Sequence, residues 1–235
     1  MLTNKLSVVI ITYNEETYIE EAIASAKFAD EVLVLDSFST DKTCEIAESL
    51  GAKVSQQKWL GFGAQKNKAI SLAKNHWVFV LDADERIPLA LQEEIKTMLK
   101  NPLYEGYFVP RLNNFWGKNI KTCGLYPDYT IRLFNKNKAS FNDVAVHESV
   151  QMKSKAGYLK NAMEHLAYAS IDEFISKQNR YSTLHHKKKN MWKAIVNPTW
   201  TFFKLFIVKK GFLDGLDGYI ISKLYAQYTF WKYVK

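Results

Sequence analysis

The sequence predicts an α/β protein: a wound, mostly parallel sheet flanked by helices, followed by a mainly helical, basic C-terminal extension. Apolar runs typical of buried strands alternate four times with helical patterns in the first hundred residues, as in parallel sheets with right-handed crossovers. Charge also divides the chain, because residues 1–150 hold 17 Lys+Arg and 19 Asp+Glu, whereas residues 151–235 hold 15 and 5. We therefore expect two parts, residues 1–165 and residues 166–235.

Composition excludes several other classes of protein. The 235 residues are 47% hydrophobic and 24% charged, which is typical of a globular core and not of a disordered chain. No stretch without a charged residue exceeds about ten residues, whereas a transmembrane helix takes roughly twenty apolar ones. We expect no signal peptide at the N-terminus. The isolated Cys44 and Cys123 lack metal-binding spacing and fit a reducing cytosol.

Four short apolar runs predict the parallel strands, at residues 6–12, 31–36, 52–56 and 76–81. Apolar residues at helical spacing predict the helices that follow them, at residues 16–28, 42–50, 62–74 and 88–99. Asp41 is placed to cap the second helix and Gly51 to end it. Strand-like pieces follow at residues 107–111, 113–121, 129–135 and 144–150, and the pattern from residue 171 onward is mainly helical.

Polar turns follow three of the predicted strands, at residues 12–15, 36–39 and 82–84. In wound sheets ligands bind beyond the carboxyl ends of the strands, so these turns are expected to line one crevice. Asp82 and Asp84 lie two residues apart, where both carboxylates can face the same side. Hard oxygen ligands of this kind hold Mg²⁺ or Mn²⁺, which in turn bridges a diphosphate. The alternative is a solvated acidic loop that caps the next helix.

Other polar residues near these turns suit a nucleotide. The carboxylate of Asp36 can accept a hydrogen bond from a ring N–H or a ribose hydroxyl, the alternative being a simple turn. Lys66 and Lys68 begin the third helix, and either could reach a diphosphate there, although a solvated position is favoured for Lys68. The sequence has no G-x-G-x-x-G after the first strand and no Gly-Lys-Ser/Thr loop. A metal and side chains must therefore neutralise the negative charge of the phosphates.

Four successive segments resemble the signatures of glycosyltransferase family 2, the inverting enzymes with the Rossmann-like GT-A fold. They are SVVIITYNEE, EVLVLDSFSTDKT, GFGAQKNKAI and WVFVLDADERI, which together cover residues 5–100 in the order and spacing of the family. The later segments RLFNKNKASFNDVAVHESV and KKGFLDGLDGY resemble the bacterial subfamily that includes the lipopolysaccharide inner-core β-1,4-glucosyltransferases acting on heptose. Relatives with other acceptors share this second match.

The resemblance implies a nucleoside diphosphate sugar donor, UDP-glucose foremost, and a divalent metal, Mg²⁺ or Mn²⁺. It implies these roles: Thr12, Tyr13 and Glu15 border the nucleoside, Asp36 contacts the base, Lys66 lies near the phosphates, Asp82 lies by the ribose and Asp84 holds the metal. Many family members carry Arg at the position of Gln65-Lys66. The phosphate contact assigned to Lys66 is therefore a point at which this sequence departs from the family pattern.

An inverting transfer needs a general base that takes the proton of the acceptor hydroxyl on the face opposite the leaving diphosphate. Glu148 is the favoured candidate, because the His-Glu pair of the subfamily follows a short strand that is expected to return to the crevice. Asp143 and Asp128 are the other candidates. His147 completes the metal shell or, alternatively, lies in the core. Arg132 contacts phosphate or acceptor or forms an ordinary surface salt bridge.

The C-terminal extension interleaves lysines with aromatic residues. Each Lys or Arg near an anionic leaflet contributes about 1 kcal/mol to binding, and Trp and Phe enter the interface readily. The extension contains no recognised nucleic-acid module. We therefore expect it to lie on an anionic membrane surface and not on nucleic acid, the alternative being a core of its own with solvated lysines.

Together these features predict an inverting, metal-dependent glycosyltransferase that moves a hexose, glucose foremost, to a lipid-linked cell-envelope saccharide such as lipopolysaccharide inner core. Residues 1–165 would be the GT-A nucleotide-sugar-binding and catalytic domain, and residues 166–235 would face acceptor and membrane. The expected location is cytoplasmic, peripheral on the inner face of the cytoplasmic membrane. An alternative is a nucleotide-binding scaffold whose basic tail binds membrane or RNA without catalysis. A nucleotidyltransferase is disfavoured, because its Gly-rich loop is missing after the first strand.

Overall fold

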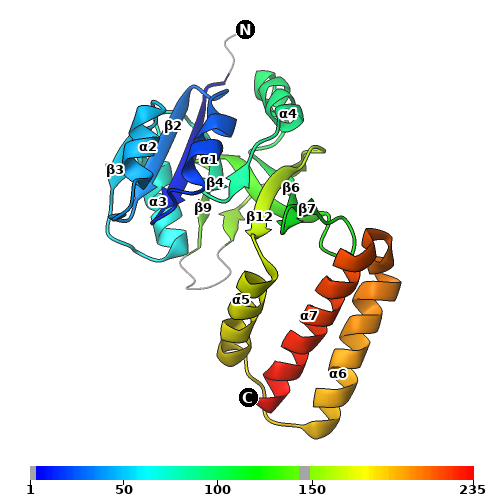
Figure 1. Ribbon diagram of the computed structural model, residues 1–235. Helices are drawn as coiled ribbons and strands as arrows, with labels where there is room; N and C mark the ends of the chain where they lie inside the picture. The colour runs from blue at the N-terminus through cyan, green and yellow to red at the C-terminus, as the bar shows by residue number, and fades with distance from the viewer. Residues whose placement is uncertain (1–3, 143–148) are drawn as a thin grey trace. The chain divides into compact units, whose positions relative to one another are not determined.

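The computed structural model describes residues 4–142 and 149–235 (Figure 1). The chain divides into two compact units. The first, here called the sheet unit, consists of the residues up to Arg111 and of Tyr129–His165; the second, the helical unit, consists of Leu112–Asp128 and Leu166–Lys235. The predicted functional division at residue 165 stays a prediction.

One sheet organises the first unit. Its strands lie in the order β3-β2-β1-β4-β8-β6-β12-β5, and β1 pairs in parallel with β2 and β4, whereas β4 and β8 are antiparallel. The bounds are β1 Leu6–Thr12, β2 Glu31–Asp36, β3 Lys53–Gln56, β4 Trp77–Asp82, β5 Glu85–Arg86, β6 Gly106–Phe115, β7 Lys118–Asn119, β8 Asp128–Asn135, β9 Ala139–Phe141, β10 Val150–Met152, β11 Gly157–Tyr158 and β12 Met163–Tyr168.

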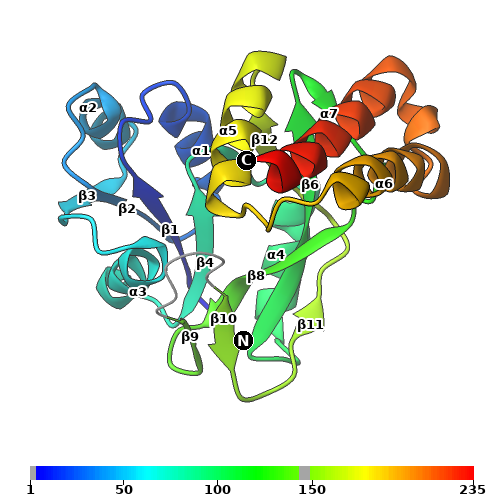
Figure 2. The same ribbon diagram turned by 90° about the horizontal axis from the view of Figure 1, so that it is seen from below.

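Helices cover both faces of the parallel strands, because successive strand residues point to opposite sides. Val8 and Ile10 of β1 face α1 (Ile19–Ala26), α2 (Thr43–Ser49) and α4 (Leu89–Lys100), whereas Val9 and Ile11 face α3 (Phe62–Leu72). Figure 2 shows α3 on one side of β1 and β4 and the helices α1 and α2 on the other. All seven residues of β1 are buried, as expected for a central parallel strand.

The predicted α/β class with a mostly parallel sheet is confirmed. The four predicted strand–helix pairs are present, and Gly51 follows α2 with a φ of +83°, as the C′ position requires. The first helix begins later than expected, at Ile19, because side chains hold the preceding turn: Asp41 accepts from the Glu16 N–H at 3.1 Å and Glu16 accepts from the Lys42 N–H at 3.1 Å. Of the predicted strand 144–150, residues 144–148 lie outside the described residues.

The helical unit contains the long helices α5, α6 and α7 (Figure 1). Its helices are α5 Ile171–Leu184, α6 Met191–Phe203, the π-helical turn η1 Lys204–Val208, the 3₁₀ turn η2 Gly211–Asp214 and α7 Gly215–Val234. The core joins Phe115, Ile120 and Cys123 from residues 112–128 to Phe174 of α5 and Ile221 of α7. The mainly helical character expected from residue 171 onward is confirmed.

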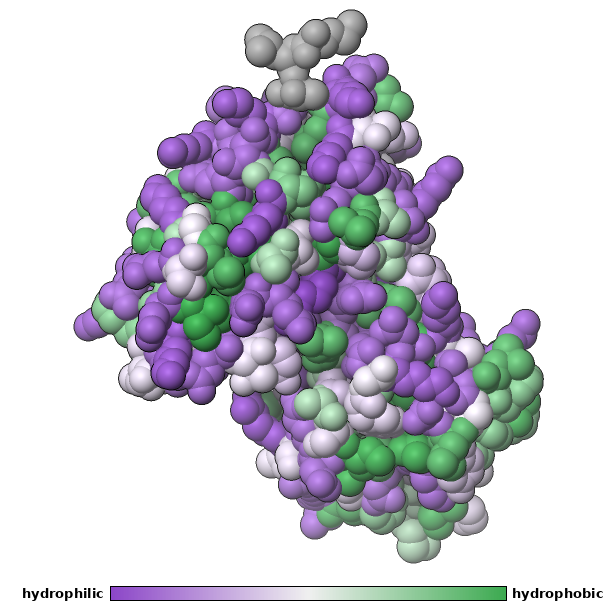
Figure 3. All heavy atoms as spheres, turned by 45° about the horizontal axis from the view of Figure 1, so that its top comes forward, coloured by the Kyte–Doolittle hydropathy of each residue, from purple (hydrophilic) through white to green (hydrophobic). Residues whose placement is uncertain are grey.

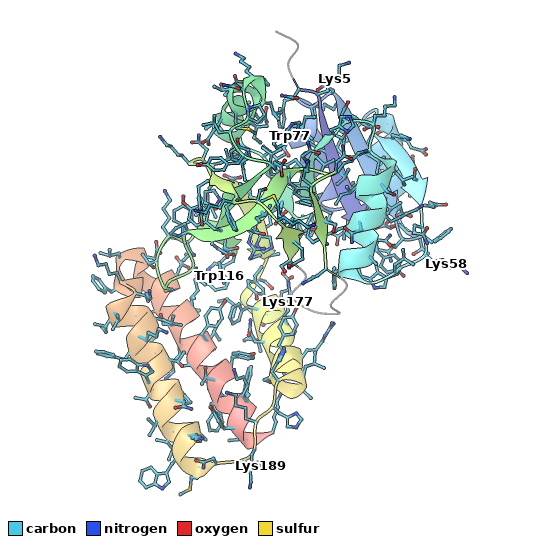
Figure 4. All side chains as sticks on the ribbon, turned by 180° about the vertical axis from the view of Figure 1, so that it is seen from behind. Lys5, Lys58, Trp77, Trp116, Lys177 and Lys189 are labelled. Carbon is cyan, nitrogen blue, oxygen red and sulfur yellow. The ribbon has the colours of Figure 1, made fainter. Side chains whose placement is uncertain are left out.

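Contacts between the 112–128 segment and α7 hold the helical unit together. The Trp116 Nε1–H donates to Asp217 Oδ1 at 2.7 Å, and Lys118 Nζ lies 2.9 Å from Asp217 Oδ2; Figure 4 labels Trp116 beside the start of α7. A Cβ on Gly218 would lie 1.8 Å from the carbonyl oxygen of Gly211, so only glycine allows this approach of α7 to η2. Among the residues that the structure describes, no helix combines the length and apolar character needed to cross a bilayer.

Candidate active site

A cavity of about 720 Å³ opens at the carboxyl ends of β1 and β4. The strand order reverses between these two strands, which is where ligands bind in wound sheets. The residues that line the cavity belong to the sheet unit. They are Ile11, Thr12, Tyr13, Glu15, Ser37, Trp59, Phe62, Lys66, Asp82, Ala83, Asp84 and His165. The polar turns after the first, second and fourth strands thus meet in one crevice.

The turn after β1 presents three side chains to the cavity: Thr12, Tyr13 and the half-buried Glu15. Thr12 is 5% exposed and Tyr13 is 56% exposed. Asn14 follows with a φ of +55°, and its side-chain oxygen accepts from the Thr40 N–H at 2.8 Å. The Asn14 N–H in turn donates to Ser39 Oγ at 2.8 Å, so the turns after β1 and β2 hold each other in place.

Asp36 lies below the cavity surface. It is fully buried and accepts hydrogen bonds from the Ser39 N–H and the Ser39 hydroxyl. Burial and the neighbouring Asp36 carboxylate raise the pKa of the Cys44 thiol to about 11. Ser37, the next residue, does line the cavity and accepts from Gln65 Nε2 at 3.0 Å. In this conformation Asp36 fixes the turn, and Ser37 is the residue that faces the cavity.

An aromatic pair, which the sequence analysis did not predict, borders the cavity. The Trp59 and Phe62 rings meet edge to face with centroids 4.8 Å apart, and they are 48% and 49% exposed. Gly61 between them has a φ of +97°, a conformation that favours glycine. Figure 4 labels Lys58 of the same loop at the edge of the sheet unit. The pair offers exposed ring surface to a flat or apolar part of a ligand.

Asp82 is held between two buried cations. Its carboxylate oxygens lie 3.2 Å from Lys66 Nζ and 2.7 Å from Arg132 Nη2, and both cations are 4% exposed. Burial opposes ionisation of Asp82, but Arg132 and Lys66 outweigh it and hold the pKa of this carboxyl well below its usual range. Asp82 is therefore an anion whose charge is already compensated by the protein.

Glu85 completes this buried network. It is fully buried, its Oε1 lies 2.6 Å from Arg132 Nη2, and its Oε2 accepts from the Asp82 N–H at 3.0 Å. Burial raises the pKa of Glu85 above its ordinary value; Arg132 lowers it in part, and the charges of Asp82 and Asp84 raise it further. The surface salt bridge expected as one role of Arg132 is wrong, because Arg132 is buried and bridges two carboxylates of the sheet.

Asp84 differs from Asp82 in its charged partner and not in its exposure, because the Asp82 side chain is itself 29% exposed. The Asp84 side chain is 34% exposed, and its Oδ2 lies 3.4 Å from His165 Nε2. The register of β12 against β5 places His165 opposite Glu85, the residue after Asp84. Nothing in the sequence near His165 indicates this position, because it depends on the pairing of strands about eighty residues apart along the chain.

The donor set fits a metal that shares its coordination with a ligand. Asp84 offers carboxylate oxygens and His165 an imidazole nitrogen, both of which bind Mn²⁺, and the carboxylate also suits Mg²⁺. Within residues 4–142 and 149–235, no three His, Cys, Asp or Glu side chains are grouped to hold a metal. Mg²⁺ sites commonly use one or two carboxylates and complete the shell with substrate phosphates.

Two of the other predicted residues, Asp128 and Lys68, do not line the cavity, and three lie outside the described residues. Glu148, Asp143 and His147 lie outside the described residues. Asp128 is the first residue of β8 and belongs to the helical unit. Lys68 is exposed on α3, whereas Lys66 lines the cavity.

Comparison with known proteins identifies the family. The family model described as Glycosyl transferase family 2 matches residues 7–167. An uncharacterised glycosyltransferase of Rickettsia bellii (strain RML369-C) is 35% identical over 255 residues, which cover 100% of this chain and 87% of the relative. The chain therefore belongs to glycosyl transferase family 2, and the predicted family and enzyme class are confirmed.

A second relative and a solved structure add detail. The lipopolysaccharide core biosynthesis glycosyltransferase LpsC of Rhizobium meliloti is 28% identical over 240 residues, covering 96% of this chain and 89% of LpsC. TarS residues 1–349 of S. aureus, solved in complex with UDP, share the fold with a TM-score of 0.52 at 18% identity, over 90% of this chain and 75% of that chain. The fold is that of the GT-A glycosyltransferases, as predicted.

Proposed function

We propose that this glycosyltransferase is inverting and metal-dependent, and that it moves a hexose from a nucleoside diphosphate donor, UDP-glucose foremost, to a lipid-linked cell-envelope saccharide such as lipopolysaccharide inner core. The observation that carries the proposal is the division of labour between two carboxylates. Both carboxylates line the cavity, but Asp82 is neutralised by Lys66 and Arg132, whereas the ion-pair distance described for Asp84 is to the His165 imidazole, at 3.4 Å.

The nucleoside end of the donor would lie against the turn after β1. Thr12 Oγ1 is buried and has no hydrogen-bond partner within the described residues, so a ligand in the cavity can supply one. Tyr13 and Glu15 would border the nucleoside, and Asp82 would lie by the ribose. The proposed contact of Asp36 with the base requires it to release Ser39; otherwise Asp36 supports the base through Ser37.

The diphosphate would lie between Asp84 and Lys66. Asp84 and His165 would hold Mg²⁺ or Mn²⁺ there, and the metal when bound neutralises charge on the leaving diphosphate. Lys66 adds a positive charge at the cavity wall. Because Lys66 is paired with Asp82, its ammonium group is already oriented and needs little reorganisation when the leaving group departs.

Glu148 is proposed as the general base. In an inverting transfer the base takes the proton of the acceptor hydroxyl as that oxygen attacks the anomeric carbon, and the bond to the diphosphate breaks on the opposite face. Asp143 and Asp128 remain the alternative candidates. Residues 1–165 would thus carry the chemistry, with residues 166–235 facing acceptor and membrane.

The acceptor and location rest on the name of LpsC and on the charge of the chain. The similarity to a lipopolysaccharide core glycosyltransferase over 96% of this chain favours a saccharide acceptor that is linked to lipid. The basic C-terminal extension favours an anionic membrane surface. The proposed location is therefore peripheral, on the inner face of the cytoplasmic membrane.

The test is donor turnover with and without Mg²⁺ or Mn²⁺. Asp84→Ala should lower the hydrolysis of UDP-glucose by about a thousandfold, because several kcal/mol of charge stabilisation are lost. Glu20→Ala, which removes an exposed carboxylate on α1, is the matched control and should leave the rate unchanged. Equal rates for Asp84→Ala and the control would refute the metal site, and binding of no nucleotide sugar would refute the donor class.

Glu148→Gln separates the enzyme from a nucleotide-binding scaffold. With a lipid-linked saccharide acceptor, this variant should lose transfer by at least about a hundredfold while its donor affinity stays unchanged. NMR of the wild-type product should show inversion at the anomeric carbon. Retention of configuration, or unchanged transfer by Glu148→Gln, would contradict the proposed base.

A further inference from the structure

Helix α6 and the turn η1 have an apolar inner face that packs on α7. The Phe202 ring lies 5.6 Å from the Tyr219 ring, and Asn197 Nδ2 donates to Tyr233 Oη at 2.8 Å. Ala194 on the same face is buried. These contacts pack the inner face of α6 within the helical unit.

The outer face of α6 and η1 is also apolar, and it is exposed. It is made of residues three or four positions apart along the helix: Trp192, Ile195, Val196, Trp200, Phe203 and Ile207, which are 45% to 73% exposed. Apart from Thr199, the exposed positions between Lys193 and Lys204 are all apolar. Figure 3 shows apolar surface gathered over the helical unit. Contiguous exposed apolar side chains of this kind mark a surface that contacts another protein or a membrane.

Positive charge surrounds this outer face. Residues 174–213 contain nine Lys or Arg and no Asp or Glu. Lys187, Lys188 and Lys189 precede α6, and Lys209 and Lys210 follow η1; Figure 4 labels Lys189 in the loop before α6. A second copy of this chain would bring these like charges together, whereas an anionic lipid surface complements them.

We infer that the outer face of α6 and η1 lies in the plane of an anionic bilayer. Its aromatic and aliphatic side chains enter the boundary between headgroups and acyl chains, about 5–10 Å deep, and the flanking lysines contact lipid phosphates. The helix does not cross the bilayer, which agrees with the finding above for the described residues. This inference adds the contact surface to the membrane association in the proposed function. It rests on the proposed function only in the choice of an anionic leaflet.

The experiment is flotation of the full chain with vesicles. Vesicles of phosphatidylethanolamine with about 30% phosphatidylglycerol should bind the protein at low salt, and phosphatidylcholine vesicles should bind it at least about tenfold more weakly, because several lysine contacts are lost. Phospholipids brominated on the acyl chain should quench tryptophan fluorescence. No flotation with anionic vesicles at low salt would overturn the inference.

Variants locate the binding surface. The double substitution Ile195→Asp and Trp200→Asp should lower the partition coefficient about tenfold or more, because two apolar side chains can no longer leave water. Leu89→Asp, at a residue of α4 that is 75% exposed, is the matched control and should bind as the wild type does. An equal loss in both variants would overturn the inference, as would a concentration-dependent dimer that the double variant abolishes while vesicle binding is unchanged.

The two proposals fail in different ways. The double variant should hydrolyse UDP-glucose in solution at the wild-type rate, because neither residue lines the cavity of the sheet unit. A protein that turns over donor and does not float refutes only the membrane surface. A protein that floats through α6 and binds no donor refutes only the catalytic proposal.

Discussion

In the sheet unit, Lys66, Arg132 and Glu85 are charged side chains with at most 4% exposure, and each is paired with an opposite charge. In the helical unit, Trp192 and Trp200 are apolar side chains with 73% and 57% exposure. Both arrangements are costly in an isolated protein: a buried charge must be compensated, and a large exposed apolar patch promotes association.

The two units therefore differ in how they use side chains that are costly for folding. In the sheet unit the costly side chains are buried charges, and Lys66 and Arg132 fix Asp82 beside a cavity. In the helical unit the costly side chains are exposed apolar residues, which add nothing to the core of that unit. A side chain that is costly for folding and unused within the fold is a candidate for contact with something outside it.

The largest effect is expected from breaking the buried network. Arg132→Leu should lower the free energy of unfolding by about 3–5 kcal/mol, because Asp82 and Glu85 lose the cation they share. Urea denaturation measures this loss. The control is Lys118→Met in the helical unit, which removes a partly exposed ion pair with Asp217 and should cost less than about 1 kcal/mol. Similar losses in the two variants would mean that burial does not distinguish the two pairs.

The acid stability of the sheet unit should depend on Asp82. Its native pKa is lowered, so its stabilisation is present above its unfolded value, about pH 4, and is lost as the pH falls through the native pKa. The free energy of unfolding should therefore fall between pH 5 and pH 2.5 by about 1–3 kcal/mol more in the wild type than in Asp82→Asn. Parallel acid limbs for the two proteins would contradict the pairing.

Glu85 has the opposite sign. Its native pKa is raised, so its contribution to stability is present below its unfolded value and is lost as the pH rises through the native pKa. Glu85→Gln should flatten the stability curve above about pH 4. The same denaturation series, extended to pH 7, compares the free energy of unfolding of Glu85→Gln with that of the wild type. Parallel curves for the two proteins would contradict the raised pKa of Glu85.

The smallest effect is expected on the exposed face of α6. Phe203→Ser should change the free energy of unfolding by about 1 kcal/mol or less, because the ring is 46% exposed. Its neighbour Phe202 packs against the Phe206 and Tyr219 rings, so Phe202→Ser should cost about 3 kcal/mol. Thermal unfolding of the pair compares the two faces of one helix. A larger loss for Phe203→Ser would show that the outer face is part of the core.

The sequence predicts local features of this protein well. Runs such as residues 6–12 are apolar throughout because both faces of a central parallel strand are covered, and Gly51 marks the end of α2 because its φ is positive. Asp82 and Asp84 are found from their place after an apolar strand. These features depend on neighbours within a few residues along the chain.

Features that depend on distant pairing were not predicted. His165 reaches Asp84 only through the pairing of β12 with β5, and Arg132 reaches Asp82 from β8. The burial of Asp36 follows from the turn that Ser39 closes over it. The sequence shows the residue types in each case, but it does not show which strand lies beside which.

The helical unit is built from two stretches of chain, 112–128 and 166–235, and its core takes Phe115, Ile120 and Cys123 from the first and Phe174 and Ile221 from the second. A chimera joined at residue 165 would separate these partners and expose both halves of the core. Exchange of the helical unit between relatives must therefore transfer both stretches at once. In evolution the short stretch and the long one should accordingly change as a single module.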